Sequence, residues 1–93
     1  MATPIMIPTP LRQFTGNLDS VFVEGTSVGE ALNDLCTKYS PLRRHLYTDD
    51  GKLRSFVNIY VNDEDIRYLK KEATPLKEKD VVSIIPSIAG GAN

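Results

Sequence analysis

One segment of the chain places its apolar residues at the spacing of an α-helix. Ser27 and Glu30 precede and open it as an S-x-x-E capping box, in which each side chain can accept a backbone N–H of the other residue. Pro41 disfavours the helical conformation at the residue before it. The pattern predicts one main helix between these points, because the apolar positions line a single face. Those positions are Val28, Ala31, Leu32, Leu35, Cys36 and Tyr39.

Two strands joined by a turn are predicted before this helix. Residues 5–11 are rich in apolar side chains but include Pro8 and Pro10, so we expect an edge-like or bulged strand there. Residues 13–17 contain a Gly-Asn turn signal, and residues 20–24 alternate apolar and polar side chains. This arrangement favours a β-hairpin.

Further strands are predicted after the helix, beyond a short helical turn and loop over residues 41–53. Residues 56–61 alternate, and residues 66–69 are interpreted as a short returning strand. Residues 74–80 have loop character, and residues 81–85 form a nearly continuous apolar strand suited to the centre of a sheet. Residues 56–61 place Val57, Ile59 and Val61 on one face of the strand and Phe56, Asn58 and Tyr60 on the other.

The order of these elements indicates an α+β fold. A last strand lying beside the first, with the helix across one face, gives the β-grasp (ubiquitin-like) architecture, a mixed sheet of four to five strands packed on one main helix. We therefore expect a single β-grasp domain over residues 1–86, followed by a flexible C-terminal tail over residues 87–93.

Composition narrows the classes of function. The chain has 93 residues, of which 41% are hydrophobic and 25% charged, as in ordinary globular domains. Its 11 basic and 12 acidic residues leave a net charge of −1, which argues against a nucleic-acid binder. One cysteine allows no internal disulfide, and no signal peptide or run of ~18–20 apolar residues is present. We expect a cytoplasmic protein with neither a nucleic-acid nor a membrane partner.

The side chains most often used in catalysis have ordinary interpretations here. Cys36 lies on the apolar helical stripe, where a thiol behaves as a small hydrophobe. His45 has no second histidine or cysteine at metal-ligand spacing and is expected to be a surface imidazole. Residues 62–65 read Asn-Asp-Glu-Asp without the spacing of a calcium loop, which favours a solvated turn. Two pairs of basic residues are expected to be solvated or to form the rim of a protein interface. They are Arg43 with Arg44, and Lys70 with Lys71.

The C-terminal residues carry the one feature with a chemical use. After Pro86 the side chains become small and end in Gly90-Gly91, followed by Ala92 and Asn93. Glycine lets the main chain approach another backbone closely. Seven extended residues would reach about 20 Å or more from the body of the domain. This suits a tail that enters a narrow active site on another protein, although a frayed chain end has the same appearance.

Three blocks of the sequence resemble the MoaD/ThiS family of ubiquitin-like sulfur carrier proteins. The central block, residues 52–67, contains FVNIYVNDEDIR, while residues 7–12 read IPTPLR and residues 82–91 read VSIIPSIAGG. The likeness covers residues 5–91 and is greatest with the actinobacterial members that serve cysteine biosynthesis. The terminal Gly-Gly pair strengthens the resemblance given by the central block. A Gly-Gly pair alone would not be specific to this family.

This resemblance implies a protein cosubstrate and not an enzyme. In the family, an E1-like enzyme adenylates the last glycine carboxylate with ATP, and sulfide or a persulfide then displaces AMP to leave a thiocarboxylate. Carried onto this sequence, Gly91 bears the sulfur, while Gly90 and Ala89 form the tail that threads into partner enzymes. The resemblance implies no bound cofactor, no metal and no catalytic residue. ATP is used only by the activating enzyme.

The sequence departs from the family pattern after Gly91. While Ala92 follows in peptide linkage, Gly91 has no carboxylate to activate, so we expect a JAMM-type metalloprotease to cut between them first. The sulfur-accepting synthase could act on an activated serine derivative, a molybdopterin precursor, a thiazole or a secondary metabolite. Two alternatives stay open: a ubiquitin-like modifier joined through Gly91 to a lysine, and a non-catalytic β-grasp interaction domain.

Overall fold

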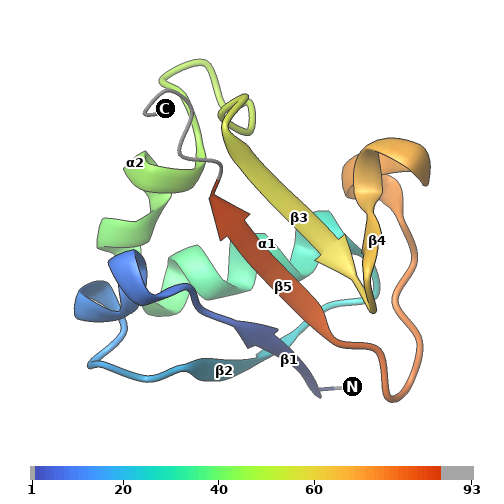
Figure 1. Ribbon diagram of the computed structural model, residues 1–93, viewed down its shortest axis with the longest axis horizontal. Coiled ribbons are helices and arrows are strands. Elements are labelled where there is room, and N and C mark those ends of the chain that lie inside the picture. Colours follow the sequence, from blue (N-terminus) through green and yellow to red (C-terminus); the bar gives the residue numbers. More distant parts are fainter. Residues whose placement is uncertain (1, 87–93) are drawn as a thin grey trace.

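The computed structural model describes residues 2–86, which form one sheet with the main helix across one face (Figure 1). The strands are β1 (Ala2–Met6), β2 (Ser20–Glu24), β3 (Val57–Val61), β4 (Glu64–Asp65) and β5 (Val82–Pro86). The α-helices are α1 (Val28–Lys38) and α2 (Arg43–Leu46). Short 3₁₀ helices cover Thr9–Phe14, Ser40–Leu42, Ile66–Tyr68 and Lys71–Ala73.

The sheet has the strand order β2-β1-β5-β3-β4. β5 is central, parallel to β1 on one side and antiparallel to β3 on the other. The last strand therefore lies beside the first, and α1 passes behind the sheet in the view of Figure 1. This confirms the predicted α+β class and the β-grasp architecture.

The core lies between the sheet and α1. The predicted helical stripe is buried from Val28 to Cys36, and of the two faces of β3 the one that carries Val57, Ile59 and Val61 is buried. β1, β2 and β5 add Ile5, Val23 and Val82, which are fully buried. Because strand side chains alternate, the opposite face of the same sheet is left open.

The start of α1 matches half of the predicted capping box. The Glu30 N–H donates to Ser27 Oγ over 3.2 Å, as expected. The Glu30 carboxylate instead accepts the N–H and hydroxyl of Thr26, at 2.8 and 2.9 Å. The backbone N–H of Thr26 is the main reason that the pKa of Glu30 is lowered. Side chains therefore still satisfy two backbone N–H groups at the start of the helix. The one that accepts from upstream bonds to Thr26, however, and not to Ser27 as expected.

The strand predicted over residues 5–11 is wrong beyond Met6. β1 ends there, and residues 9–14 form a 3₁₀ helix. Pro10 fits the first turn of that helix because a proline has no N–H to lose and a fixed φ. β1 and β2 do pair antiparallel, but through this long connection and not through the tight turn that was predicted.

The predicted strand at residues 66–69 is also wrong. β4 comprises only Glu64 and Asp65, and Ile66–Tyr68 is a 3₁₀ helix. The Asp65 carboxylate accepts the N–H of Arg67 at 2.9 Å and caps this helix. Such side-chain capping competes with continued strand pairing.

Candidate functional site

The functional hypothesis depends on residues that follow β5. Ala89, Gly90, Gly91, Ala92 and Asn93 lie outside the described residues, as does the whole predicted tail over residues 87–93. What the structure describes is the root of that segment. β5 ends at Pro86, which pairs with Val57 at the start of β3. The root is therefore held by β3, while β1 pairs with the earlier part of β5, at Val82 and Ser83.

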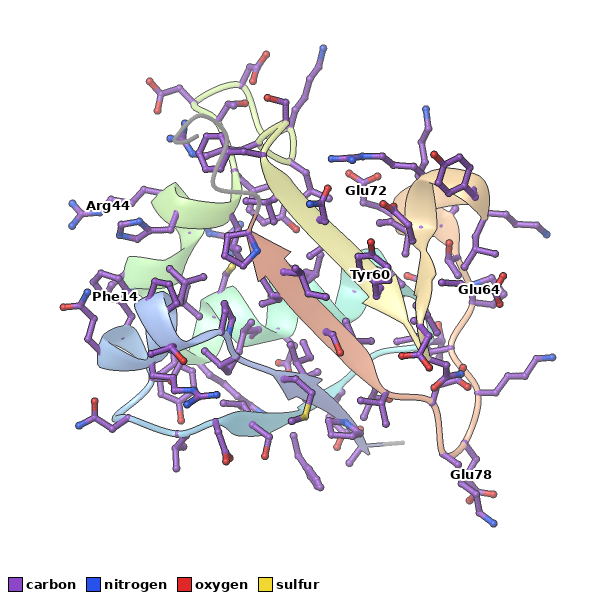
Figure 2. The ribbon with its side chains drawn as sticks, in the orientation of Figure 1. Phe14, Arg44, Tyr60, Glu64, Glu72 and Glu78 are labelled. Carbon is purple, nitrogen blue, oxygen red and sulfur yellow. The ribbon has the colours of Figure 1, made fainter. Side chains whose placement is uncertain are left out.

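Apolar side chains are exposed on the open face around this root. Ile85, the residue before Pro86, is 46% exposed, and Phe56 next to the start of β3 is also 46% exposed. Met6 lies on the neighbouring strand β1 and is 41% exposed. Tyr60 projects from β3 on the same face, away from α1 (Figure 2). We name Ile85, Phe56, Met6 and Tyr60 the root face.

Hydrogen bonds within the loop before β3 fix the part of the root face that this loop carries. Tyr47 forms an isolated β-bridge with Leu53, and the Arg54 N–H donates to the Leu46 carbonyl at 2.9 Å. Arg54 Nε donates to the Arg44 carbonyl at 2.8 Å. From the other side, Arg67 donates to the Ser55 carbonyl at 2.9 Å. These bonds hold residues 54–55, and hence Phe56, at a defined position beside Pro86.

Cys36 is placed as the sequence predicted, inside the core and only 1% exposed. Burial raises the pKa of its thiol, and the charge of Arg43 lowers it by less. A buried thiol that is kept protonated is a poor nucleophile. Cys36 is therefore a packing residue.

His45 is not the surface imidazole that was predicted. Its ring stacks on Phe14, with ring centroids 4.4 Å apart and an angle of 28° between the planes. Nε2 is buried and finds no hydrogen-bond partner within residues 2–86. Phe14 lies at the same end of the molecule as Arg44, which precedes His45 (Figure 2). Sequence reasoning missed this pair because the two residues are 31 positions apart and belong to different elements.

The acidic turn after β3 has a structural use. Asn62 has a left-handed φ of 58°, and its side chain donates to Asp80 at 2.8 Å and accepts the Val81 N–H at 2.9 Å. Asp80 also accepts the Lys77 N–H, the main cause of its lowered pKa. These bonds connect this turn to the loop that leads into β5. Within residues 2–86 no three metal-ligating side chains lie together.

A groove of about 630 Å³ lies on the helix side of β3, between residues 52–55 and the two 3₁₀ helices that follow β4. Its floor consists of Val57, Ile59 and Ile66, all almost fully buried. Glu72 lies on its rim (Figure 2). We assign the groove no chemistry. No helix in the described part of the chain is long and apolar enough to cross a membrane.

Comparison with known proteins identifies the class. The sequence profile of the ThiS family matches residues 5–91, and the chain belongs to that family. It is 43% identical over 93 residues to the sulfur carrier protein CysO of Mycobacterium tuberculosis, covering 98% of this chain and 100% of the relative. It is 34% identical over 68 residues to small archaeal modifier protein 3 of Haloferax volcanii, covering 73% of each. The resemblance stated from the sequence is confirmed.

Solved structures give the same result. A chain of the Amycolatopsis orientalis BexX/CysO complex superposes with a TM-score of 0.87 at 37% identity, covering 97% of this chain and 100% of that one. CysO of Mycobacterium tuberculosis superposes with a TM-score of 0.84 at 41% identity, covering 91% and 98%.

Proposed function

We propose that this protein is a sulfur carrier that bears a thiocarboxylate on Gly91. The observation that carries the proposal is the match to the ThiS family through residue 91, together with 43% identity to a sulfur carrier over nearly the whole chain. The fold supports the proposal because Pro86 ends the central strand, so the residues after it start from a rigid base.

The proposed chemistry takes place in partner enzymes. The Gly91 carboxylate attacks the α-phosphorus of ATP and releases pyrophosphate, leaving an acyl adenylate. Sulfide then attacks the acyl carbon and expels AMP, so that a C–S bond replaces the C–O bond to phosphate. AMP is needed because a free carboxylate is a poor electrophile. The carrier supplies no catalytic residue and holds no cofactor.

Partner enzymes must bind the folded domain while the glycines enter their active sites. We propose that they bind the root face. Its side chains come from β1, β3, β5 and the residue before β3, and they lie alongside the stretch of β5 that leads to Pro86. The partners proposed are an E1-like adenylating enzyme and a sulfur-accepting synthase. The relative from Amycolatopsis orientalis was crystallised with BexX, which fits a carrier that binds partners as a folded domain.

We also propose that a JAMM-type protease first removes Ala92 and Asn93. The peptide bond between Gly91 and Ala92 must be cut before any carboxylate exists there. The profile match ends at the same residue, Gly91. The intact mass of the protein from its native host tests this step, and a persistent Ala92-Asn93 terminus under conditions of sulfur use contradicts it.

The deciding experiment combines residues 1–91 of the protein with a purified E1-like enzyme, ATP and sulfide. The expected product has the intact mass of the carrier with one oxygen replaced by sulfur. The full 93-residue chain and a reaction without ATP are the matched controls, and both are expected to stay unmodified. Failure of the 1–91 form to gain sulfur with an active enzyme contradicts the proposal.

A second candidate function is protein modification through Gly91. It is favoured by the 34% identity to a small archaeal modifier protein and by 36% identity over 72 residues to ubiquitin-related modifier 1 of Encephalitozoon cuniculi. Higher-mass conjugates that disappear when Gly91 is deleted would favour this function. If replacing Gly91 by a bulkier residue changes neither the yield of thiocarboxylate nor that of conjugates, the protein is a non-catalytic interaction domain.

A further inference from the structure

β2 forms one edge of the sheet and pairs only with β1 among the described strands. The register places Phe22 opposite Pro4, which has no N–H to donate. Since paired residues in antiparallel strands alternate between bonded and non-bonded positions, the peptide groups of Phe22 point away from β1. The same alternation turns the peptide groups of Ser20 and Glu24 to the outside.

Two side chains of α1 cover part of this outer edge. The Glu24 N–H donates to Asp34 Oδ2 over 2.8 Å, and Lys38 Nζ donates to the Phe22 carbonyl over 3.1 Å. Asp34 and Lys38 also form an ion pair at 3.3 Å, one helical turn apart. We call this pair of residues the Asp34–Lys38 clamp. It occupies one donor and one acceptor that a further strand would need.

The edge has the properties of a strand that readily pairs with another chain. It is five residues long, contains no proline, and carries Phe22, which is 58% exposed. The opposite edge, β4, has only two residues, both acidic. Short or charged edges resist pairing, whereas long apolar edges invite it unless something covers them.

We propose that the Asp34–Lys38 clamp prevents β2 from pairing with β2 of a second copy of this chain. In the symmetric antiparallel pairing that the clamp blocks, Phe22 lies opposite Phe22 of the second copy, and Ser20 lies opposite Glu24. The Phe22 carbonyl and the Glu24 N–H then bond to the other backbone and release Lys38 and Asp34. The Phe22 side chains meet directly, a pairing that stabilises adjacent strands. This inference does not depend on the sulfur chemistry.

The test removes both clamp residues together. The double variant Asp34→Ala/Lys38→Ala keeps the net charge of the chain, because one acidic and one basic residue are lost. Light scattering after gel filtration is expected to give 10.3 kDa for the wild-type protein at all concentrations. The measured mass of the double variant is expected to rise toward twice that value as the protein concentration increases. Lys77→Ala/Glu78→Ala, on the loop before β5, is the charge-neutral control and is expected to stay monomeric.

A rescue variant shows which surface forms the dimer. Adding Phe22→Lys to the double variant places like charges opposite each other and is expected to restore the monomer. A folded double variant that stays monomeric at its highest soluble concentration overturns the proposal. A dimer that persists with Phe22→Lys, or a wild-type protein that already pairs through Phe22, also overturns it.

A milder change covers the case in which the double variant does not fold. Lys38→Met keeps the apolar stem of the side chain and frees the Phe22 carbonyl. It is expected to dimerise more weakly in the same assay, and a folded, strictly monomeric Lys38→Met protein overturns the proposal. Amide hydrogen exchange adds a second readout, since the Glu24 amide is expected to exchange faster in Asp34→Ala than in wild type.

Discussion

At the scale of single residues, environment decides which side chains can react. In Cys36 and Tyr47 the environment favours the neutral form; Cys36 belongs to the core and Tyr47 packs against it. The pKa of Tyr47 is raised to about 12, chiefly by burial, with contributions from the negative charges that Cys36 and Glu72 can carry and an opposing effect of Arg43. Neither group is suited to acid–base work near neutral pH.

Tyr47 predicts how stability changes in alkali. Its pKa is raised in the folded protein, so its contribution to stability is complete below pH 10 and is lost as pH rises from about 10 to about 12. The free energy of unfolding of the wild-type protein, from urea denaturation, is expected to fall more steeply over that range than that of Tyr47→Phe. Parallel pH profiles would contradict this assignment.

The glycines give a second prediction at this scale. Gly90→Ala and Gly91→Ala are expected to leave the thermal midpoint unchanged, because the sequence predicts a tail beyond the domain of residues 1–86 at these positions. Each is expected to slow thiocarboxylate formation, because a Cβ narrows the choice of backbone conformations inside the partner enzyme. Calorimetry and intact-mass kinetics measure the two effects. A loss of stability as large as that of a core truncation would mean that these glycines are packed in the fold.

At the scale of elements, α1 stabilises the sheet through its buried stripe. Leu32 and Leu35 are fully buried, so Leu32→Ala and Leu35→Ala are each expected to lower the free energy of unfolding by about 2–5 kcal/mol. Thr37→Ala, at an exposed position of the same helix, is the matched control and is expected to change it by about 0.5 kcal/mol or less. Urea denaturation measures all three. Equal effects at Leu32 and Thr37 would contradict the assignment of the buried face.

The elements also show how far sequence patterns reach. Periodicity located α1, β2, β3 and β5 because each buries one continuous face. It failed where local hydrogen bonding competes with strand pairing, at Pro10 and at Asp65. It also could not explain Gly29, a weak helix former inside α1. A Cβ there would lie 3.2 Å from the Glu72 backbone oxygen, so the glycine allows the 3₁₀ helix at Lys71–Ala73 to approach.

The candidate site was predictable in one part only. Gly90 and Gly91 could be proposed from the sequence because their chemistry depends on residue type and position. The root face could not, because Phe56, Ile85 and Met6 are far apart in the chain and lie in or next to three different strands. Their meeting depends on the strand order, which periodicity does not determine. The Phe14–His45 stack was missed because its residues lie in two elements far apart in the chain, and the Asp34–Lys38 clamp because its bonds to β2 depend on how α1 packs against the sheet.

At the scale of the whole molecule, the root face predicts where partner enzymes bind. Ile85→Asp and Phe56→Ala are each expected to raise the KM for the carrier in thiocarboxylate formation by roughly tenfold, with kcat nearly unchanged. Tyr68→Ser is the control, because Tyr68 is 87% exposed on the 3₁₀ helix that follows β4 and lies outside the root face. Equal KM values for Ile85→Asp and Tyr68→Ser would place the binding surface elsewhere.

The central position of β5 has a consequence for synthesis on the ribosome. Without β5, the described strands form two separate pairs, β1 with β2 and β3 with β4, and neither pair contacts the other within the sheet. A nascent chain therefore cannot complete its sheet until residues 82–86 have emerged from the ribosome. A chain that terminates before β5 lacks both the joint of the fold and the glycines that follow it. Completion of the sheet thus requires that β5, and not only the four earlier strands, has been synthesised.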